Sequence, residues 1–326
     1  MSRLPKIGIS CGDINGVGTE ILIKSINRLL DLEILIVFFG SVKLWSFYSK
    51  NNKNASRYNL ISNISELKKN KINIFNCLND DLEINPGKMT TFSGSAAFSS
   101  LECATNFAID RKIDILITMP LCKSNVKQPF VGHTEYLRDK CGVLQNLMLL
   151  ASNKIKLATL TNHTPIKLIS SKISINKISN KIEILARSLE MDFNINHPKL
   201  AVLGLNPHAG DNGLIGQEEI SIISPAIKQK RLEGLNVYGP FSSDAFFAKK
   251  KYKSFDAVLS MYHDQGLIPF KMLSSNQGGV NFTAGLPIIR LSPDHGPAYD
   301  IANTGVVNCD SFFAAIKLGI EIFNNR

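Results

Sequence analysis

Short apolar runs rich in β-branched residues alternate with amphipathic patterns of helical period along the whole chain. This alternation is typical of parallel strands joined by crossover helices, so the sequence predicts the α/β class. Strands are expected at Ile7–Ser10, Ile34–Phe39, Ile72–Phe75, Ile113–Thr118, Lys156–Leu160, Leu200–Leu205 and Ala257–Ser260. Helices are expected at Glu20–Leu30, Ser95–Ile109, Glu135–Cys141, Ile175–Met191, Glu218–Lys230, Asp244–Lys250 and Asp310–Phe323. The polar stretch Lys50–Asn54 is expected to be a surface loop.

The composition is that of a soluble globular protein, with 44% hydrophobic and 20% charged residues among 326. It excludes collagen-like and wholly disordered chains. No internal repeat or linker is visible, which favours two lobes that share a core over separate domains. The longest apolar run, Ile34–Phe39, is far shorter than the roughly 20 residues that span a bilayer. The N-terminal residues lack the apolar region of a signal peptide. We therefore expect a cytoplasmic protein with no membrane partner.

The net charge of +10 comes from an excess of lysine. No helix-turn-helix, zinc-finger or RNP-type pattern accompanies this charge, so a solvated lysine-rich face is favoured over a nucleic-acid interface. A mildly positive field would also attract an anionic metabolite. The six cysteines form no C-x-x-C pair, and we expect them to be reduced and mostly buried.

Three of the six histidines share one context. His163, His208 and His263 each follow the C-terminal end of an expected strand. Ligands bind outside the carboxyl ends of the strands in open α/β sheets, so these imidazoles could meet at one point. Three imidazoles favour zinc and leave a coordination position open for substrate. Asp244 and Asp264 are candidates for supporting or additional ligands, although Asp244 could equally be an ordinary residue at a helix start.

The glycine-rich loop Gly12–Glu20 follows the first expected strand. It has the general form of a phosphate-binding loop, but it matches neither common fingerprint. A tight turn with Thr19 as the helix N-cap is the favoured alternative.

Other polar residues near expected element ends could bind anions. His133 and Thr134 lie at a helix start, where backbone N–H groups can also contribute. Arg290 follows an apolar run and could bind phosphate or carboxylate, or form a surface ion pair. Lys271 could hold an anion, act as an acid or base, or be simply solvated.

The segment Asp294–Asp300 is a turn before the last expected helix. Its members Asp294, His295, Gly296 and Asp300 could contact a nucleotide. A purely structural turn is equally compatible with the sequence.

Several of these motifs also occur in one family, in this order and nearly from end to end. They are Gly12-Asp13, Gly16–Gly18, Gly132–Glu135, Leu205–Gly210, Met261–Gly266, Val280–Thr283, Gly285–Pro287 and Asp294–Gly296. The chain thereby resembles the 4-hydroxythreonine-4-phosphate dehydrogenases of pyridoxine biosynthesis, the PdxA family.

This resemblance implies the fold of the isocitrate and isopropylmalate dehydrogenases. That fold has two α/β/α lobes, with the active site in the cleft between them, closed by the second subunit of a homodimer. We expect a discontinuous terminal lobe of about 1–130 and 283–326 around a central lobe of about 131–282.

The resemblance also implies the ligands of the site. In the family a divalent metal (zinc, magnesium or cobalt) is held by histidines that match His163, His208 and His263. Residues that contact the substrate phosphate and carboxylate match His133, Thr134, Lys271, Asn281 and Arg290. The implied reaction is NAD- or NADP-dependent oxidation of 4-phosphooxy-L-threonine at C3, followed by loss of CO2 to give 3-amino-2-oxopropyl phosphate. The proton acceptor would be Lys271 or a metal-bound hydroxide.

Three alternatives stay open at this point. A paralogue could oxidise another phosphorylated four-carbon acid, such as erythronate or threonate phosphate. The same histidines could serve a metal hydrolase that needs no nucleotide. A non-catalytic metabolite-binding protein would bind such a ligand without turnover.

Overall fold

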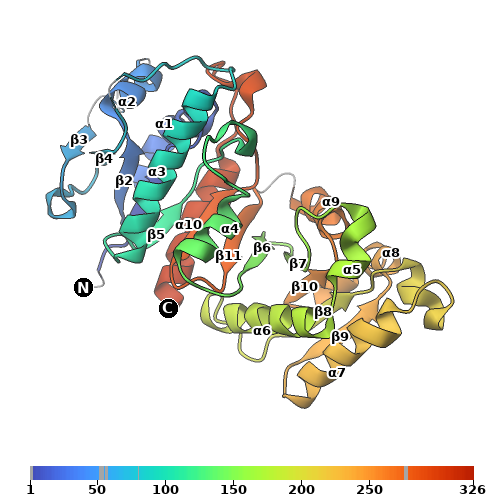
Figure 1. The fold of residues 1–326 in the computed structure, drawn as a ribbon. Coiled ribbons are helices and arrows are strands. Elements are labelled where there is room, and N and C mark those ends of the chain that lie inside the picture. Colours follow the sequence, from blue (N-terminus) through green and yellow to red (C-terminus); the bar gives the residue numbers. More distant parts are fainter. Residues whose placement is uncertain (1–2, 51–54, 56–57, 80, 275–277) are drawn as a thin grey trace. The chain divides into compact units, whose positions relative to one another are not determined.

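The computed structural model describes residues 3–50, 55, 58–79, 81–274 and 278–326. It divides into two compact units (Figure 1). Unit 1 comprises Met1–Gly142 and Leu286–Phe323, and unit 2 comprises Val143–Gly285 and Asn324–Arg326. The chain thus passes from unit 1 into unit 2, returns to unit 1, and ends with its last three residues in unit 2. The first boundary falls after residue 142 rather than after about 130, and the second falls after residue 285 rather than after about 282. Residues 51–54 of the expected surface loop lie outside the described residues.

Unit 1 is built on a sheet of parallel strands in the order β3-β4-β2-β1-β5-β12. The strands are β1 (Lys6–Ser10), β2 (Leu35–Gly40), β3 (Tyr58–Ile61), β4 (Ile72–Asn76), β5 (Ile115–Ile117) and β12 (Ile289–Pro293). Strands β2 and β5 contain no polar side chain, as is typical of sheets covered on both faces.

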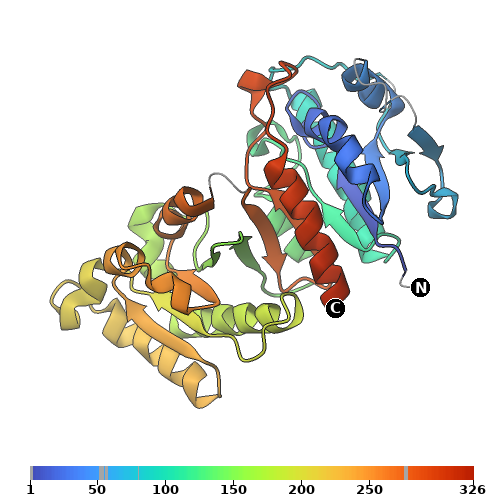
Figure 2. The ribbon, with the colours of Figure 1, turned by 180° about the vertical axis from the view of Figure 1, so that it is seen from behind.

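Helices cover both faces of this sheet. They are α1 (Gly18–Leu30), α2 (Val42–Ser49), α3 (Thr91–Ile109), α4 (His133–Lys140) and α10 (Asp310–Asn325). Opposite views of unit 1 show α3 on one face and α1 and α10 on the other (Figures 1 and 2). The guanidinium of Arg28 on α1 lies 3.9 Å from the ring centroid of Phe313 on α10, which joins the two helices.

Helix α4 is attached to α3 within unit 1. The rings of Tyr136 and Phe98 are 5.3 Å apart, and Lys140 pairs with Glu102 at 2.7 Å. These contacts explain why the boundary of the unit falls after α4. His133 and Thr134, which the sequence assigned to the central lobe, therefore belong to unit 1.

The sheet of unit 2 is mixed, with the order β11-β6-β7-β10-β8-β9. Its strands are β6 (Leu147–Ala151), β7 (Lys156–Thr159), β8 (Leu200–Leu203), β9 (Val237–Phe241), β10 (Ala257–Ser260) and β11 (Val280–Ala284). Strand β6 pairs antiparallel with both β11 and β7, whereas β7, β10, β8 and β9 are parallel. The expected strands β7, β8 and β10 are parallel as predicted, and the antiparallel pairs arise from β6, which the sequence pattern did not indicate.

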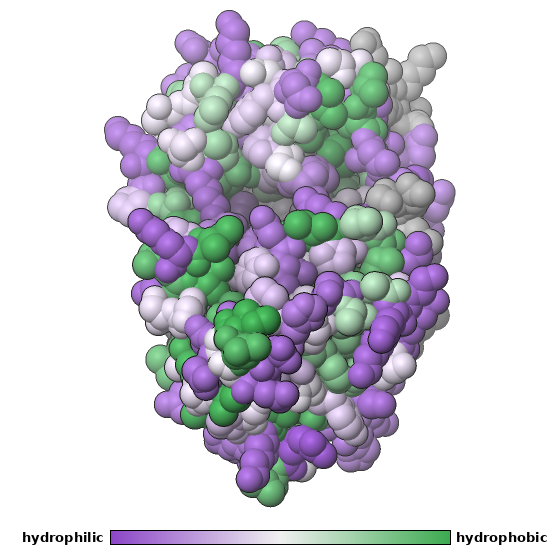
Figure 3. Space-filling model, turned by 90° about the vertical axis from the view of Figure 1, so that its right-hand side faces the viewer, coloured by the Kyte–Doolittle hydropathy of each residue, from purple (hydrophilic) through white to green (hydrophobic). Residues whose placement is uncertain are grey.

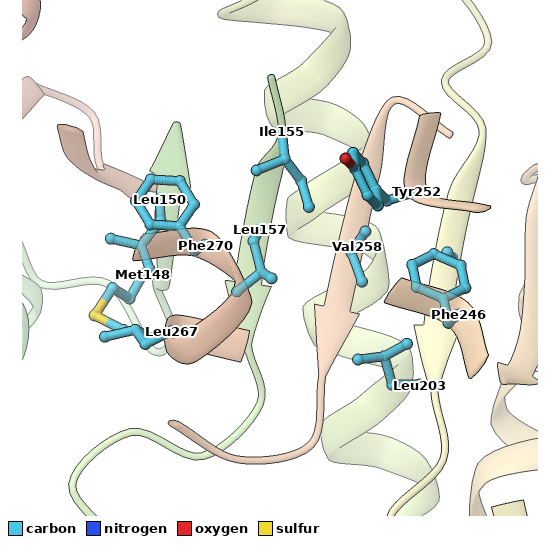
Figure 4. Packing of buried hydrophobic residues seen from close by; sticks show 11 residues of the cluster. Met148, Leu150, Ile155, Leu157, Leu203, Phe246, Tyr252, Val258, Leu267 and Phe270 are labelled. Atoms are coloured by element: carbon cyan, nitrogen blue, oxygen red, sulfur yellow. The ribbon is translucent and has the colours of Figure 1, made fainter. Parts of the chain in front are cut away.

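The helices of unit 2 enclose an apolar core. They are α5 (Ile169–Lys172), α6 (Ile175–Met191), α7 (Ser224–Leu232), α8 (Ser243–Ala248) and α9 (His263–Ser274). Phe246 of α8 and Phe270 of α9 pack on Leu157, Val258 and neighbouring strand residues (Figure 4). Side chains alternate along a strand, so the other strand residues point to the opposite face, where α6 and α7 pack.

Hydrophilic residues cover most of the face drawn in Figure 3, with hydrophobic patches between them. No helix in the described part of the chain is both long and apolar enough to cross a membrane. The six cysteines are unpaired, as expected, but only Cys11 is fully buried.

Candidate functional site

Strands β7, β10 and β8 are adjacent and parallel, so their carboxyl ends lie at one edge of the sheet of unit 2. His163 lies in the loop after β7, His208 in the turn after β8, and His263 is the first residue of α9 after β10. The strand-end positions expected from the sequence are therefore correct for all three.

Two of these imidazoles are neighbours. The ring centroids of His163 and His263 are 5.9 Å apart, with 39° between the ring planes. Nδ1 of His263 lies 2.6 Å from a carboxylate oxygen of Asp264. A carboxylate on one ring nitrogen leaves the other nitrogen to face a ligand, which is how metal-binding histidines are usually oriented. Asp264 thus lies in contact with His263, and its role beside a metal stays a prediction.

His208 lies on an unusual turn, η4 (Pro207–Gly213). Its residues from His208 to Asn212 have positive φ values between 42° and 80°. This left-handed conformation costs about 1 kcal/mol or more for each non-glycine residue, so surrounding contacts must hold it.

Glu219, buried at the start of the π-helix η5 (Glu219–Ile223), anchors the two residues that lead into this turn. Its carboxylate accepts the backbone N–H groups of Leu205 and Asn206 at 2.7 and 2.8 Å, and the amide of Asn206 at 2.9 Å. From the sequence, Glu218 and Glu219 are expected only to suit the positive N-terminal end of the helix that follows the loop; these hydrogen bonds are not predictable from it. Two adjacent glutamates after a glycine-rich turn were the available signal.

Asp244, on α8, is exposed and interacts electrostatically with His208. Ser242 donates a hydrogen bond to Asp244, and this bond lowers the pKa of the carboxyl group, which His208 lowers further. Nitrogen and carboxylate donors of this kind fit a divalent metal. Within the described residues, however, no three histidine, cysteine, aspartate or glutamate side chains are gathered closely enough to form a complete metal-binding group.

Two further residues of unit 2 were expected to bind substrate. Lys271 lies on α9 and is exposed, and Asn281 lies on β11. Oδ1 of Asn281 is shielded from solvent without a hydrogen-bond partner among the described residues. A buried amide oxygen in this state costs free energy unless a ligand or water satisfies it.

Arg290, on β12 of unit 1, is 1% exposed. The alternative of a surface ion pair is therefore wrong. Its Nε and Nη2 donate to Oγ1 of Thr118 at 3.0 and 2.5 Å. Burial lowers the pKa of the guanidinium to about 9, and Glu135 opposes this shift. A buried cation gains stability from an anion, so this position suits a phosphate or carboxylate.

His133 begins α4, as expected, and Thr134 follows it. Nε2 of His133 is shielded from solvent and has no hydrogen-bond partner in the described structure. Its pKa lies well below 6.5 because of burial and the positive charges of Arg290 and Lys123. The neutral imidazole can therefore donate or accept a hydrogen bond toward a bound anion.

Lys123, in η2 (Lys123–Asn125), completes this group of charges. A Cβ atom on Gly132 would lie 3.0 Å from Nζ of Lys123 and 2.9 Å from Oε2 of Glu135, so a glycine leaves room for both charges. Lys123 is not predictable as a member of this group, because nothing in the local sequence pattern distinguishes it from the many solvated lysines.

The loop Gly12–Glu20 is not a phosphate-binding loop. All of its residues are buried, and its N–H groups at Asp13, Gly16 and Val17 already bond to backbone carbonyls of the protein. The alternative of a tight turn agrees with this packing, but its capping residue is wrong, because Thr19 lies inside α1 and Val17 precedes the helix. A glycine-rich strand-to-helix turn does not by itself distinguish ligand binding from tight packing.

In the segment expected to bind nucleotide, Asp294 and His295 are half-buried and Gly296 and Asp300 are exposed. Asp300 belongs to the short helix η7 (Tyr299–Ile301). Nδ1 of His295 lies 2.9 Å from the carbonyl oxygen of Gly296, and its Nε2 is shielded, with no hydrogen bond to any described residue.

The family model described as "Pyridoxal phosphate biosynthetic protein PdxA" matches residues 32–319. The chain belongs to the PdxA family. A 4-hydroxythreonine-4-phosphate dehydrogenase of Bacteroides thetaiotaomicron is 40% identical, over 98% of this chain and 89% of that protein. A protein of Oceanobacillus iheyensis named "Putative D-threonate 4-phosphate dehydrogenase" is 37% identical, over 99% of both chains.

Solved structures agree with this PdxA assignment. The 4-hydroxythreonine-4-phosphate dehydrogenase of Klebsiella pneumoniae has a TM-score of 0.83 and 33% identity, covering 99% of this chain and 98% of that one. The isocitrate dehydrogenase of Methylococcus capsulatus has a TM-score of 0.51 at 12% identity, covering 99% and 86%. The fold implied by the resemblance is thereby confirmed.

Proposed function

We propose that the protein oxidises 4-phosphooxy-L-threonine with NAD or NADP, in the formation of the pyridoxal phosphate skeleton. The observation that carries this proposal is a cluster of cationic and imidazole side chains in unit 1, in which Arg290 is buried. Arg290, His133 and Lys123 place positive charge and a neutral imidazole together in a chain of the PdxA family. A phosphorylated amino acid supplies both phosphate and carboxylate groups to such a site.

We propose that His163, His208 and His263 hold a divalent metal, with Asp244 and Asp264 as supporting carboxylates. Two features support this proposal: the three strand ends at one sheet edge, and the 5.9 Å separation of two of the rings. Zinc, magnesium or cobalt held there would act as a Lewis acid toward substrate oxygens.

The proposed reaction has two stages, oxidation at C3 and loss of the carboxylate. Hydride leaves C3 for the nicotinamide, and the hydroxyl proton passes to Lys271 or to solvent, which gives a 3-oxo acid. The C1 carboxylate then leaves as CO2, its bonding electrons forming an enolate between C2 and C3. Protonation at C2 yields 3-amino-2-oxopropyl phosphate. Arg290, His133 and Thr134 are assigned to hold the anionic groups, with Asn281 as a further substrate contact.

We assign the dinucleotide to the segment that contains Asp294, His295, Gly296 and Asp300. The shielded Nε2 of His295 supports this assignment, because a ligand could satisfy it.

The test is reduction of NAD by the purified protein with 4-phosphooxy-L-threonine, before and after chelation and after restoring zinc, magnesium or cobalt. We expect NADH formation that stops on chelation and returns with metal. A protein that binds NAD but does not oxidise this substrate under any metal condition would contradict the proposal.

A second substrate deserves a parallel assay, because one relative is named for D-threonate 4-phosphate. Threonate and erythronate phosphates lack the amino group of 4-phosphooxy-L-threonine but share its phosphate, carboxylate and C3 hydroxyl. We expect a higher kcat/KM for the amino acid. The reverse order would assign the protein to the paralogous activity.

We further propose that the protein acts as a homodimer. Three large apolar side chains near the turn that carries His208 are exposed to solvent. Their exposed fractions are 84% for Leu214, 43% for Ile215 and 52% for Ile220. Apolar residues in this setting are typical of subunit interfaces. Light scattering should give about twice the chain mass of 36.0 kDa, and Leu214→Glu should shift the protein toward the monomer. A monomeric wild-type protein at micromolar concentration would contradict this proposal.

A further inference from the structure

The glycine-rich loop of unit 1 is bound to the segment that we assign to the cofactor. The hydroxyl of Tyr299 donates to Oδ2 of Asp13 at 2.8 Å, and the N–H of Val17 donates to the carbonyl oxygen of Pro297 at 2.9 Å. A Cβ atom on Gly16 would lie 2.7 Å from that same carbonyl oxygen, so the backbones approach as closely as glycine permits.

Glu20 extends this attachment along the segment. Its two carboxylate oxygens accept the N–H groups of Asn303 at 2.7 Å and Gly305 at 3.0 Å. Lys24, one turn further along α1, donates to the carbonyl oxygen of Gly305. Residues 297–305 are therefore fixed at both ends by the loop and the first turns of α1.

Both carboxylates are buried, with Asp13 at 1% and Glu20 at 8% exposed. Asp13 also accepts hydrogen bonds from Ser93 at 3.1 Å, Asn125 at 2.8 Å and the N–H of Asn15 at 3.0 Å. Burying a carboxylate costs free energy unless hydrogen bonds replace its hydration. The carboxylate oxygens of Asp13 and Glu20 thus accept hydrogen bonds from other groups of the protein rather than from a ligand.

The segment needs such support because part of its backbone is strained. Ala298 and Asn303 have φ values of 46° and 60°, in the left-handed region. A left-handed alanine costs about 1 kcal/mol or more, and it persists only where surrounding contacts hold it. Asp13 binds the side chain of Tyr299, which follows the strained Ala298. Glu20 binds the N–H of Asn303, which is itself strained.

We propose that Asp13 and Glu20 are positioning residues for the cofactor: they hold residues 294–305 in the conformation that binds the dinucleotide. This inference rests on the proposed function, which assigns Asp294, His295, Gly296 and Asp300 to the cofactor. The glycine-rich loop acts through the segment, since its own N–H groups contact protein carbonyls.

The test compares Tyr299→Phe with Ser93→Ala. Each variant removes one hydroxyl that donates to Asp13, but only the first loosens the segment. In the cofactor-free protein, we expect Tyr299→Phe to speed amide hydrogen exchange in residues 294–305 about tenfold, the effect of one net hydrogen bond. The Kd and KM for NAD should rise by a similar factor, with kcat and the KM for substrate within about twofold. Ser93→Ala should leave exchange in this segment and the Kd for NAD unchanged.

Glu20→Gln is the second variant, because an amide keeps the size of the side chain and only one of its acceptor oxygens. We expect faster exchange at residues 303–305 and weaker NAD binding. Unchanged exchange in both Tyr299→Phe and Glu20→Gln would overturn the inference.

Asp300→Asn and His295→Gln separate this inference from the proposed function. If they weaken NAD binding but Tyr299→Phe and Glu20→Gln do not, the positioning role is wrong and the cofactor assignment stands. If Asp300→Asn and His295→Gln leave the Kd for NAD unchanged, the cofactor assignment is wrong, and the positioning role is overturned with it.

Discussion

The protonation of His133 is set by its surroundings. In the folded protein its pKa lies well below 6.5, because burial and the charges of Arg290 and Lys123 disfavour the imidazolium. In the unfolded chain the pKa is about 6.5. Below that pH the unfolded chain therefore binds a proton that the folded protein does not. The free energy of unfolding is therefore unaffected by the protonation of His133 well above pH 6.5, and it decreases as the pH falls below this value.

This difference predicts a measurable effect of His133→Gln. Between pH 7.5 and 5.5 the free energy of unfolding of the wild type should fall by about 1.4 kcal/mol more than that of the variant. Urea unfolding at both pH values measures it, with the exposed His197→Gln as a control that should follow the wild type. Parallel pH dependence of wild type and His133→Gln would show that the imidazole is protonated in the folded state.

Individual site residues were predictable where their place followed from the topology. His163, His208 and His263 could be found because each ends a recognisable strand. Glu219 and Lys123 could not, since their importance depends on contacts with distant backbone and charged groups. The burial of Arg290 was equally inaccessible, because an arginine after an apolar run is compatible with either face of a strand end.

Elements were predictable where one pattern dominated. Ile175–Met191 has buried residues at helical spacing and forms α6 with the expected bounds. Strands β3, β6, β9, β11 and β12 are not among the expected strands, because each is only four or five residues long and a run of that length carries little periodicity. Helix α9 was missed because it contains Pro269, which lowers helix propensity in an isolated sequence. The packing of α9 on the core of unit 2 outweighs that cost.

The turn between β1 and α1 contains a glycine, Gly12, that has both a left-handed backbone and close neighbours. Gly12 has φ of +68°, and a Cβ atom there would lie 2.6 Å from the carbonyl oxygen of Pro120 and 2.8 Å from Cβ of Met119. Gly142, which follows α4, has φ of +66° with no atom within 4 Å of such a Cβ. Both positions disfavour alanine equally through the backbone, and only Gly12 adds a steric clash.

We therefore expect Gly142→Ala to reduce the free energy of unfolding by about 1 kcal/mol and Gly12→Ala by about 3 kcal/mol or more. Urea unfolding followed by tryptophan fluorescence measures both. The only tryptophan, Trp45, is buried in unit 1, which also contains both glycines. Equal losses in the two variants would mean that the β1–α1 turn can move away from β5 at little cost.

For the molecule as a whole, the class and the fold follow from the sequence, but the extent of each unit depends on packing. The alternation of strands and helices predicts α/β architecture, and the family motifs predict the two-lobed fold. The place of α4 depends on Tyr136 and Lys140, whose partners on α3 are more than 35 residues away in the sequence. Contacts between distant segments of this kind are not encoded in any local pattern.

Binding of the proposed metal should stabilise the folded protein as a whole. An ion that binds only the folded protein stabilises it by about 2.7 kcal/mol at one hundred times its Kd. Adding zinc, magnesium or cobalt to chelated protein should therefore raise the midpoint of thermal unfolding, and His208→Gln should abolish most of this rise. His197→Gln is a matched control, because His197 and His208 have similar left-handed φ values of 51° and 53°. The substitution thus has a similar backbone cost at both positions, and only His208 belongs to the proposed metal site. A full metal-dependent rise in His208→Gln would show that the ion binds elsewhere, whatever the activity of that variant.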